Sequence, residues 1–383
     1  MEEQMKPAVS PLPADFLSYA HFERCLRTLN MQSTPGIPYC REEPSIGKWL
    51  KFDGVKYDDY RLQRLWYDTR LVLEGRYEHY MKAFVKLEPH KLDKIRNRRW
   101  RVIICFSLPV QMAWKMLFDH LNRTLIDKAF DLPVQHGFQL VHGSWKAYYH
   151  QWKSRGYNSG TDVSAWDWSV NGWMLDATLE IRKRLTRAAP DQMEIWTGIA
   201  RRLFTDAFHP GCKIVLPSGR VYRQDFYGLQ KSGSPNTIAD NSLMRCFVAI
   251  IAGMRQGRSI ILGRYVGDDA LERHDNNPDY IASLKSIYAE LGIVLKTVDF
   301  GMEFVGHRFG ENGPQPLYLS KHLWNLYHTS LDILPDYLDS MLRLYTHSPH
   351  YGLWERIADK LGVSHHTREY YEAWYDREWI DIW

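Results

Sequence analysis

A Gly-Asp-Asp sequence between two short apolar runs is the feature that most restricts the fold of this chain. It lies in RYVGDDALER, from Arg264 to Arg273. Each flanking run has the length of a strand, and glycine and aspartate are common in tight turns. The stretch therefore predicts a β-hairpin with Asp268 and Asp269 at its tip. A solvated turn is the ordinary explanation, and a site for Mg²⁺, which prefers carboxylate oxygen, is the alternative.

The magnesium alternative needs a further carboxylate, and TDVSAWDWS supplies one. Asp162 ends a short strand-like segment, and Asp167 follows five residues later. Such an aspartate is often only a helix cap. A strand ending at Asp162 beside the hairpin would instead bring three carboxylates to one sheet edge, where their repulsion favours a divalent cation. Two such cations could activate an attacking 3′-oxygen and stabilise the leaving oxygen of a phosphoryl displacement.

A helix predicted in SGSPNTIADN adds polar side chains to this set. Thr237 and Asn241 are four residues apart and share one helix face, and we expect Ser232 and Gly233 to form a mobile loop before it. The ordinary roles of serine as a helix cap and glycine as a turn residue explain the loop. They do not explain an asparagine in mid-helix, because Asn is a mediocre helix former. Pointed at Asp167, Asn241 could help to read the ribose 2′-hydroxyl, which distinguishes RNA from DNA.

The middle of the chain alternates predicted strands and helices. NGWMLDATLEIRKRL has helical spacing, and the Pro-Ser-Gly turn in CKIVLPSGRVYRQD marks a hairpin. Ser234 and Pro235 suit the N-cap and first position of the helix that follows. A later helix runs from a cap at Asn277 to a stop at Gly292. Beyond residue 315 the pattern is helical, and Ser364 is expected to cap the last helix.

The one dense charge run is KLDKIRNRRWR, residues 91–101, with six basic residues against Asp93. VIICFSLPV follows at once and has the β-branched content of a buried strand. The usual interpretation of such a run is a solvated basic face. Because it is attached to a strand, it would also suit a phosphate channel. The net charge of +4 permits nucleic acid as a partner without requiring it.

Other classes of protein are disfavoured by what the sequence contains. The five cysteines are scattered and form no C-x-x-C pair, which indicates a reducing compartment and disfavours a disulfide framework or zinc ribbon. The longest apolar run is far below the roughly 20 residues of a membrane span. The first residues lack the pattern of a signal peptide. We therefore expect a soluble, intracellular protein whose many aromatic residues mainly fill its core, with base stacking as the alternative.

Taken in order, these motifs resemble those of RNA-dependent RNA polymerases of positive-strand RNA viruses. Motif A corresponds to D-x4-D, motif B to S-G-x3-T-x3-N and motif C to G-D-D. STPGIPY looks like motif G, VKLEPHKLDKIRNRRWRVI like motif F, and LGIVLKT and EFVGHRF like motifs D and E. The resemblance covers residues 33–309 and is strongest to sobemovirus and polerovirus-like polymerases.

The resemblance implies an α+β fold, a right hand of fingers, palm and thumb with an antiparallel, RRM-like palm sheet. Residues 1–157 would form the fingers, including the template and NTP-channel segments. Residues 158–310 would form the palm, with a fingers insertion around 190–230, and residues 311–383 a small helical thumb. A compact thumb suits protein priming, whereas the aromatic tail EYYEAWYDREWIDIW could be a platform for unprimed starts. That tail could also simply pack on the body or bind a partner.

The resemblance also implies a set of site residues and two Mg²⁺ ions, for which Mn²⁺ could substitute. Asp162 and Asp268 would bridge the ions with Asp269 in support. Lys296 would protonate the pyrophosphate, and Lys285 remains an alternative for that role. The nucleotide and its ribose would contact Asp167, Ser232, Gly233, Thr237 and Asn241. The triphosphate would contact Lys86, Lys94, Arg99 and Arg101, and the template Ser33, Thr34, Pro35 and Gly36.

The implied partners are an RNA template, a primer or product strand and NTPs, with a genome-linked protein primer or other viral replication proteins. We expect no transmembrane segment, and a place in the host cytoplasm at a membrane-associated replication complex reached through partners. Two alternatives stay open. A reverse transcriptase shares the palm but would place a bulky side chain against the 2′ position. A non-catalytic RNA-binding scaffold would have no use for converging carboxylates.

Overall fold

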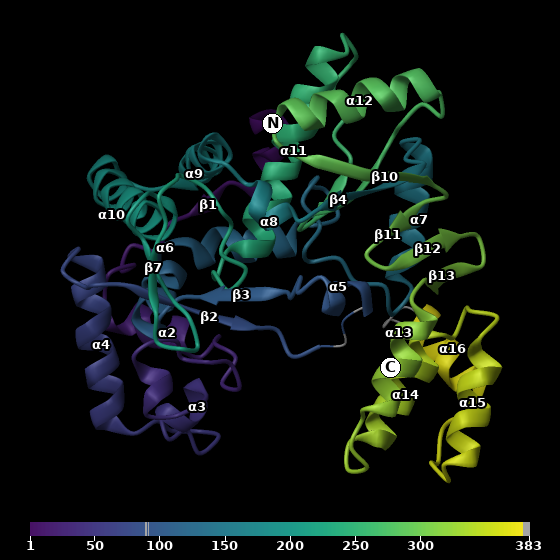
Figure 1. The fold of residues 1–383 in the computed structure, drawn as a ribbon, viewed down its shortest axis with the longest axis horizontal. Helices are drawn as coiled ribbons and strands as arrows, with labels where there is room; N and C mark the ends of the chain where they lie inside the picture. Colours follow the sequence, from purple (N-terminus) through teal and green to yellow (C-terminus); the bar gives the residue numbers. More distant parts are fainter. Residues whose placement is uncertain (89, 91, 378–383) are drawn as a thin grey trace. The chain divides into compact units, whose positions relative to one another are not determined.

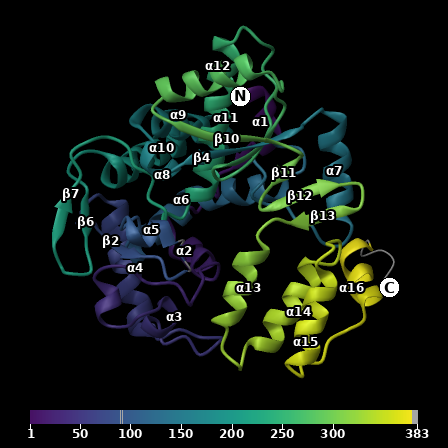
Figure 2. The ribbon, with the colours of Figure 1, turned by 45° about the vertical axis from the view of Figure 1, so that its right-hand side comes forward.

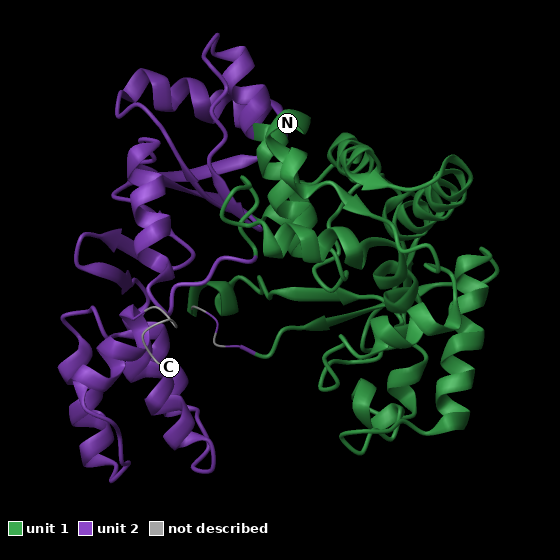
Figure 3. Ribbon diagram, turned by 180° about the vertical axis from the view of Figure 1, so that it is seen from behind, with its two compact units in different colours: residues 1–87, 92–136, 165–248 green, residues 88–91, 137–164, 249–383 purple. Residues whose placement is uncertain are grey.

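The computed structural model describes residues 1–88, 90 and 92–377, which form two compact units (Figure 3). Unit 1 comprises residues 1–87, 92–136 and 165–248, and unit 2 comprises residues 88–91, 137–164 and 249–383. Each unit is assembled from segments far apart in the sequence. The chain therefore crosses from one unit to the other several times.

Unit 1 is a set of helices with a mixed four-stranded sheet of order β3-β2-β6-β7 (Figure 1). Its strands are β1 (Ser10–Pro11), β2 (Tyr80–Val85), β3 (Val102–Cys105), β5 (Thr186–Arg187), β6 (Lys213–Val215) and β7 (Val221–Arg223). Its helices are α1 (Glu2–Met5), η1 (Lys6–Ala8), α2 (Tyr19–Leu26), η2 (Tyr39–Arg41), α3 (Ile46–Trp49), α4 (Asp59–Leu73), α5 (Leu92–Arg96), α6 (Leu108–Asp127), α8 (Trp166–Ser169), α9 (Gly172–Leu185) and α10 (Pro190–Phe208).

Helix α6 is the centre of the unit 1 core because almost every turn of it buries an apolar side chain. Trp114 stacks on Phe204 of α10 with ring centroids 5.1 Å apart, and Phe118 meets Trp196 edge to face. Trp114 and Trp196 are fully buried. The expectation that aromatic residues serve mainly as core is confirmed for these side chains.

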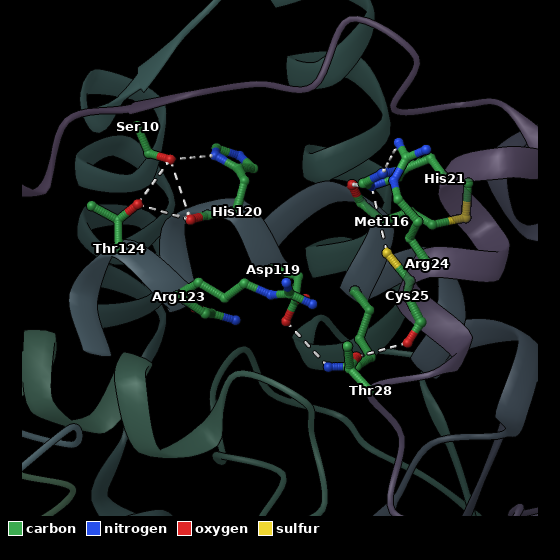
Figure 4. A network of polar contacts seen from close by, with 12 residues as sticks. Ser10, His21, Arg24, Cys25, Thr28, Met116, Asp119, His120, Arg123 and Thr124 are labelled. Atoms are coloured by element: carbon green, nitrogen blue, oxygen red, sulfur yellow. Dashed lines mark hydrogen bonds and ion pairs between the residues drawn. The ribbon is translucent and has the colours of Figure 1, made fainter. Parts of the chain in front are cut away.

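The N-terminal segment is attached to α6 by a network of polar contacts (Figure 4). The Ser10 hydroxyl donates to the carbonyl oxygen of His120 at 3.2 Å and accepts from the Thr124 hydroxyl at 3.1 Å. His21 contacts the carbonyl oxygen of Met116 at 3.1 Å. Burial lowers the pKa of His120 to about 4, so this imidazole stays neutral. The segment therefore packs on α6 through neutral, hydrogen-bonded groups.

Unit 2 contains two sheets, and the larger one carries the Gly-Asp-Asp hairpin. Its order is β10-β4-β9-β8, and all of its pairs are antiparallel. The strands of the unit are β4 (Ser159–Ser164), β8 (Arg264–Val266), β9 (Asp269–Glu272), β10 (Val294–Phe300), β11 (Glu303–Phe304), β12 (His307–Gly310) and β13 (Gly313–Pro316). The predicted hairpin and the predicted antiparallel palm sheet are confirmed.

The remaining helices are α7 (Ser144–Ser154), α12 (Pro278–Glu290), α13 (Leu319–Tyr327), α14 (Leu334–Leu344), α15 (Tyr351–Lys360) and α16 (Arg368–Asp376) in unit 2, and α11 (Thr237–Arg255), which contributes to both units. Helices α14, α15 and α16 lie side by side (Figure 2) around a buried cluster that includes Leu342, Tyr345 and Trp354. The helical pattern predicted beyond residue 315 is confirmed.

The aromatic C-terminal segment packs on the body as far as it is described. The Trp145 ring N–H on α7 donates to Asp376 Oδ1 at 2.7 Å, and His347 Nε2 lies 3.0 Å from the same oxygen. The pKa of Asp376 is lowered because these two hydrogen bonds outweigh the effect of its burial. Residues 378–383 of the predicted tail lie outside the described residues.

Two predicted helix starts are wrong by a few residues. Helix α11 begins at Thr237, not at Pro235, because the Ser234 side chain accepts from the backbone N–H of Asn236 and its carbonyl accepts from the Thr237 hydroxyl. Thr367, not Ser364, caps α16, since its hydroxyl accepts from the backbone N–H of Tyr370.

Two predicted strand ends also differ from the structure. Strand β4 continues to Ser164, two residues beyond Asp162, because β10 pairs along its whole length. In VIICFSLPV only Val102–Cys105 is strand. Helix α6 starts at Leu108 with Pro109 in its first turn, where a missing N–H costs nothing.

Among the described residues, α11 is the helix whose length and composition would allow it to cross a membrane. More than half of that stretch is buried inside the protein, and it carries Asp240 and Asn241. Both properties are typical of a core helix.

Candidate active site

The carboxylates of motifs A and C lie on neighbouring antiparallel strands of unit 2. Strands β4 and β9 pair Ser159 with Glu272 and Thr161 with Ala270. One residue further along this register, Asp162 faces Asp269, and side chains directly opposite each other have Cβ atoms about 4.5–5.5 Å apart. Asp268 is exposed in the turn next to Asp269. Two negative charges therefore oppose each other on the inner strands β4 and β9, where β9 meets the turn, with a third beside them.

This donor set fits a hard divalent cation. Mg²⁺ takes oxygen ligands and is commonly held by one or two carboxylates together with substrate phosphates. Asp162 and Asp269 supply such oxygens, and they are accessible to solvent. Within residues 1–88, 90 and 92–377, no three His, Cys, Asp or Glu side chains already converge as a closed metal site. The arrangement is thus an open site in which other ligands would complete the coordination shell.

Lys296 contacts Asp162 directly. Its Nζ donates to Asp162 Oδ2 at 2.7 Å. The β4–β10 register shifts between Leu295 and Thr297, so Lys296 is the extra residue of a β-bulge, a feature that redirects side chains beside active sites. The hydrogen bond and charge of Asp162 raise the pKa of Lys296. Lys285, the sequence alternative, lies on the exposed face of α12.

Sequence reasoning missed the buried polar cluster on the opposite face of this sheet. Glu272 is 5% exposed, and its carboxylate accepts from the hydroxyls of Thr161 at 3.1 Å and Tyr265 at 2.9 Å. His274 Nε2 lies 3.2 Å from the same carboxylate. The alternation of side chains in Asp-Ala-Leu-Glu was the available signal, since it places Glu272 on the other face from Asp269. The cluster ties β4 to the hairpin on the face opposite Asp162 and Asp269.

The predicted contact between Asn241 and Asp167 is present in unit 1. The Asn241 amide donates to Asp167 Oδ1 at 3.2 Å, and Asn241 is only 6% exposed. Asp167 lies on α8, which the chain enters through Ala165 with a left-handed φ of +51°. The mid-helix asparagine therefore has the partner that the sequence pattern predicted.

A buried ion pair fixes the helix that carries Asn241, and sequence reasoning missed it. Arg182 of α9 and Asp240 of α11 are both fully buried, with a nitrogen to oxygen distance of 2.7 Å. Arg182 also donates to the side chain of Asn122 at 3.0 Å. A charged residue in the middle of an apolar helix was the signal that could have identified it.

The Ser232–Gly233 segment, expected to be a mobile loop, is fastened to strand β3. The Gly233 N–H donates to the carbonyl oxygen of Ile104 at 2.9 Å, and the Ser232 hydroxyl accepts from the Ile104 N–H at 3.3 Å. A Cβ on Gly233 would lie 2.7 Å from the Cβ of Cys105, so only glycine fits there. At the start of α11, the Thr237 hydroxyl donates to the carbonyl oxygen of Lys231 at 2.8 Å.

The basic residues of the predicted triphosphate channel lie on the connection between β2 and β3. Lys94, Arg99 and Arg101 are exposed, and Lys86 is half-buried. The Lys86 N–H donates to the carbonyl oxygen of Arg101 at 2.8 Å, which closes the base of this connection. The cations are thus presented to solvent from a rigid strand pair.

The Ser33–Gly36 segment, predicted to contact the template, is anchored where β3 leads into α6. The carbonyl oxygen of Pro35 accepts from the Leu108 N–H at 2.8 Å. Gly36 has a φ of +66°, and a Cβ there would lie 2.4 Å from the carbonyl oxygen of Phe106. Glycine is therefore required at this close approach.

Comparison with known proteins establishes the family and the fold of the chain. Residues 18–292 match the model of the viral RNA-dependent RNA polymerase family. The structure is similar to the Sicinivirus 3Dpol RNA-dependent RNA polymerase, with a TM-score of 0.69, 15% identity and coverage of 96% of this chain and 84% of that one. The right-hand polymerase fold predicted from the motifs is confirmed.

The curated relatives are viral proteins, several of them named as a polymerase or a replicase. The chain is 30% identical to Protein P1-P2 of Pea enation mosaic virus-1 over 76% of its length, and 27% identical to the RNA-directed RNA polymerase of Mushroom bacilliform virus over 70%. It spans 25% of the first relative and 65% of the second. These and Replicase polyprotein P2AB of Cocksfoot mottle virus, 31% identical over 59% of this chain and 25% of that protein, confirm the resemblance to the sobemovirus and polerovirus-like group. The chain belongs to the viral RNA-dependent RNA polymerase family.

Proposed function

We propose that this chain carries out template-directed RNA synthesis in viral genome replication and transcription, transferring nucleotides from NTPs to an RNA 3′-hydroxyl. The observation that carries the proposal is the opposition of Asp162 and Asp269 on β4 and β9, with Lys296 bonded to Asp162 at 2.7 Å. Family membership supports the same reaction. Base choice would come from pairing with the template, so the protein needs no side chains that read bases.

Polymerases of this family generally use divalent metal ions, and we assign the ion site to Asp162, Asp268 and Asp269. Bound Mg²⁺, or Mn²⁺ in its place, would supply charge neutralisation at the attacking and leaving oxygens. The role of the chain would be to present oxygen ligands from the paired inner strands β4 and β9. The Glu272 cluster on the opposite face keeps β4 and the hairpin in register.

Lys296 is the residue we assign to the leaving pyrophosphate. A lysine with a raised pKa remains protonated at neutral pH and can donate a proton to a departing phosphate oxygen. Its hydrogen bond to Asp162 places that proton beside the metal carboxylates. Lys285 lies on the exposed face of another element, which favours Lys296 for this role.

The residues of unit 1 would select and guide the nucleotide. The Asn241–Asp167 pair and Ser232, with Gly233 and Thr237 shaping the segment, would test for a ribose 2′-hydroxyl. This pair argues against a reverse transcriptase, which must exclude that hydroxyl. The exposed cations Lys86, Lys94, Arg99 and Arg101 would guide the triphosphate, and Ser33, Thr34, Pro35 and Gly36 the template strand.

The assignment of fingers, palm and thumb to ranges of the chain is part of the proposal. Residues 1–157 would act as fingers, 158–310 as palm with an insertion around 190–230, and 311–383 as thumb. The partners would be an RNA template, a primer or product strand and NTPs, together with a genome-linked protein or other viral replication proteins. We place the activity in the host cytoplasm, at a membrane-associated replication complex reached through partners.

Incorporation of a labelled NTP on a short primed RNA with Mg²⁺ tests the proposal. We expect the wild type to extend the primer, and Asp268→Ala to lose extension while it still binds the RNA. Asp275→Ala is the matched control, because it removes an exposed carboxylate a few residues further along the same chain segment. Failure of the wild type with both Mg²⁺ and Mn²⁺ would favour the scaffold alternative.

A further inference from the structure

Lys231 is a fully buried lysine directly before the Ser232–Gly233 segment. Its Nζ donates to Gln224 Oε1 at 2.7 Å and to the carbonyl oxygen of Leu229 at 3.0 Å, and it lies 5.5 Å from the centre of the Phe208 ring. In the part of the chain that the structure describes, no carboxylate forms an ion pair with it. Burial of an ammonium group without a counter-charge is costly. A contribution to stability alone is therefore a poor explanation for this lysine.

Gln224, the main hydrogen-bond partner of Lys231, is itself buried and bonds to several segments of the chain. Its side-chain amide donates to the carbonyl oxygens of Phe208 at 2.8 Å, Phe226 at 2.8 Å and Gly228 at 3.1 Å. The Lys231–Gln224 pair therefore joins the end of α10, the segment after β7 and the turn that precedes Ser232. Leu229 in that turn has a φ of +62°, a conformation that disfavours a residue with a side chain. The hydrogen bond from Lys231 holds its carbonyl in this conformation.

The main chain of Lys231 reaches in the other direction, toward α11. Its carbonyl oxygen accepts from the Thr237 hydroxyl and from the Ser234 N–H, each at 2.8 Å. Two residues on, Gly233 is bonded to β3. The side chain and main chain of one buried residue thus attach the Ser232 segment to α10 on one side and to the first turn of α11 on the other.

We infer that Lys231 is a positioning residue for nucleotide selection: its buried ammonium holds residues 229–233 so that Ser232 and the start of α11, which carries Asn241, keep a fixed geometry. Lys231 acts through these residues and does not touch the nucleotide. Its effect on nucleotide choice rests on the proposed function, whereas its effect on the segment does not.

Amide hydrogen exchange tests the effect on the segment without any need for catalysis. In Lys231→Met, a variant of similar length without the ammonium, we expect amides of residues 228–237 to exchange about tenfold faster through local opening. Amides of α6 should be unchanged. Lys128→Met is the control, because Lys128 is exposed at the end of α6 in the same unit. Unchanged exchange at residues 228–237 in Lys231→Met would overturn the inference.

Nucleotide discrimination tests the effect on the reaction. We expect the ratio of kcat/KM for an NTP to that for its dNTP to fall about tenfold in Lys231→Met, with unchanged affinity for primed RNA. Ser232→Ala should lower the ratio similarly, and the double variant should be no worse than either, because coupled residues are not additive. Lys231→Arg, which retains a donor cation, should recover part of the loss. Two results would contradict the positioning role of Lys231. One is a loss of discrimination in the double variant that equals the sum of the two single losses, and the other is a wild-type NTP to dNTP ratio in Lys231→Met.

The two measurements separate the inference from the proposed function. If the wild type extends no RNA, the proposed function fails, while the exchange experiment still decides whether Lys231 fixes the segment. If Lys231→Met does not fold, Lys231→Gln, which keeps a neutral donor on a shorter side chain, is measured in the same two ways with the same expected results.

Discussion

At the residue scale, the closest link between geometry and chemistry is the contact of Lys296 with Asp162. In our proposal, one lysine neutralises a carboxylate that binds metal and also carries the proton that a leaving pyrophosphate needs. Both properties come from a β-bulge, which inserts Lys296 between two paired residues of β10. The motif alone suggested Lys296 without excluding Lys285, because a bulge cannot be recognised from the alternation of a short strand.

Replacement of Lys296 tests its role as the proton donor. We expect Lys296→Met to lower kcat by about 10²-fold or more, the usual contribution of a general acid, with little change in the KM for NTP. Lys285→Met should retain the wild-type rate, and the opposite pattern would move the role to Lys285.

The buried Lys231 should leave a signature in the dependence of stability on pH. Burial lowers its pKa from 10.5 to about 8, against the opposing effect of the nearby Cys212 thiol, whose own pKa is raised by burial. Below pH 8 the lysine is charged in both the folded and the unfolded protein. The folded protein then bears the full free-energy cost of burying this charge. Between pH 8 and 10.5 the unfolded chain binds more protons, so stability rises with pH.

We therefore expect the wild type to gain about 2 kcal/mol of unfolding free energy relative to Lys231→Met between pH 7 and pH 9.5. Urea unfolding of both proteins at the two pH values measures this difference, and other titrating groups cancel in the comparison. A difference that is independent of pH would show that Lys231 is not a buried, charged group at neutral pH.

At the element scale, the sequence predicts local structure wherever a turn or cap residue marks it. The hairpin at Gly267, the helix between Asn277 and Gly292 and the helical end of the chain follow from local patterns alone. The helix starts predicted at Ser234 and Ser364 were wrong, because competing hydrogen bonds decide which of several nearby polar residues caps a helix. The Glu272 and Arg182–Asp240 clusters join elements distant in sequence, so no local pattern could reveal them.

The packing of the small β11–β13 sheet against β4 depends on Gly160. A Cβ at this position would lie 2.4 Å from the carbonyl oxygen of Glu303 on β11. We expect Gly160→Ala to lower the unfolding free energy by about 1–3 kcal/mol, as overpacking does, and to reduce elongation. Gly198→Ala is the matched control: Gly198 lies inside α10 with open space around it, so alanine should stabilise by about 1 kcal/mol. Thermal unfolding distinguishes the two variants. Equal changes in stability for Gly160→Ala and Gly198→Ala would contradict this close packing of β11 against β4.

At the scale of the whole molecule, the ordered motifs predicted the family and the right-hand fold, and the comparisons confirm both. The composition of the two compact units could not be predicted, because each is assembled from separated stretches of chain that only long-range packing brings together. The fingers, palm and thumb boundaries given above therefore remain a proposal.

The charge distribution predicts how RNA binding responds to salt. A net charge of +4 is modest, so affinity should depend on the exposed cations between β2 and β3. We expect the logarithm of the binding constant for single-stranded RNA to fall steeply with the logarithm of salt concentration. Arg99→Ala should reduce that slope by about 0.7, the value for one phosphate contact. Fluorescence anisotropy measures both slopes. A wild-type binding constant that does not change with salt concentration would exclude a channel of basic residues that contact RNA phosphates.

The most direct test of the central claim is single-nucleotide incorporation by the wild type and Asp162→Asn, with primed RNA binding measured in the same samples. The substitution keeps the size of the side chain and removes the charge that faces Asp269 and binds Lys296. We expect the rate of incorporation to fall about 10³-fold, comparable to the loss of an electrostatic catalytic group, with RNA affinity unchanged. Incorporation by Asp162→Asn at the wild-type rate would contradict it.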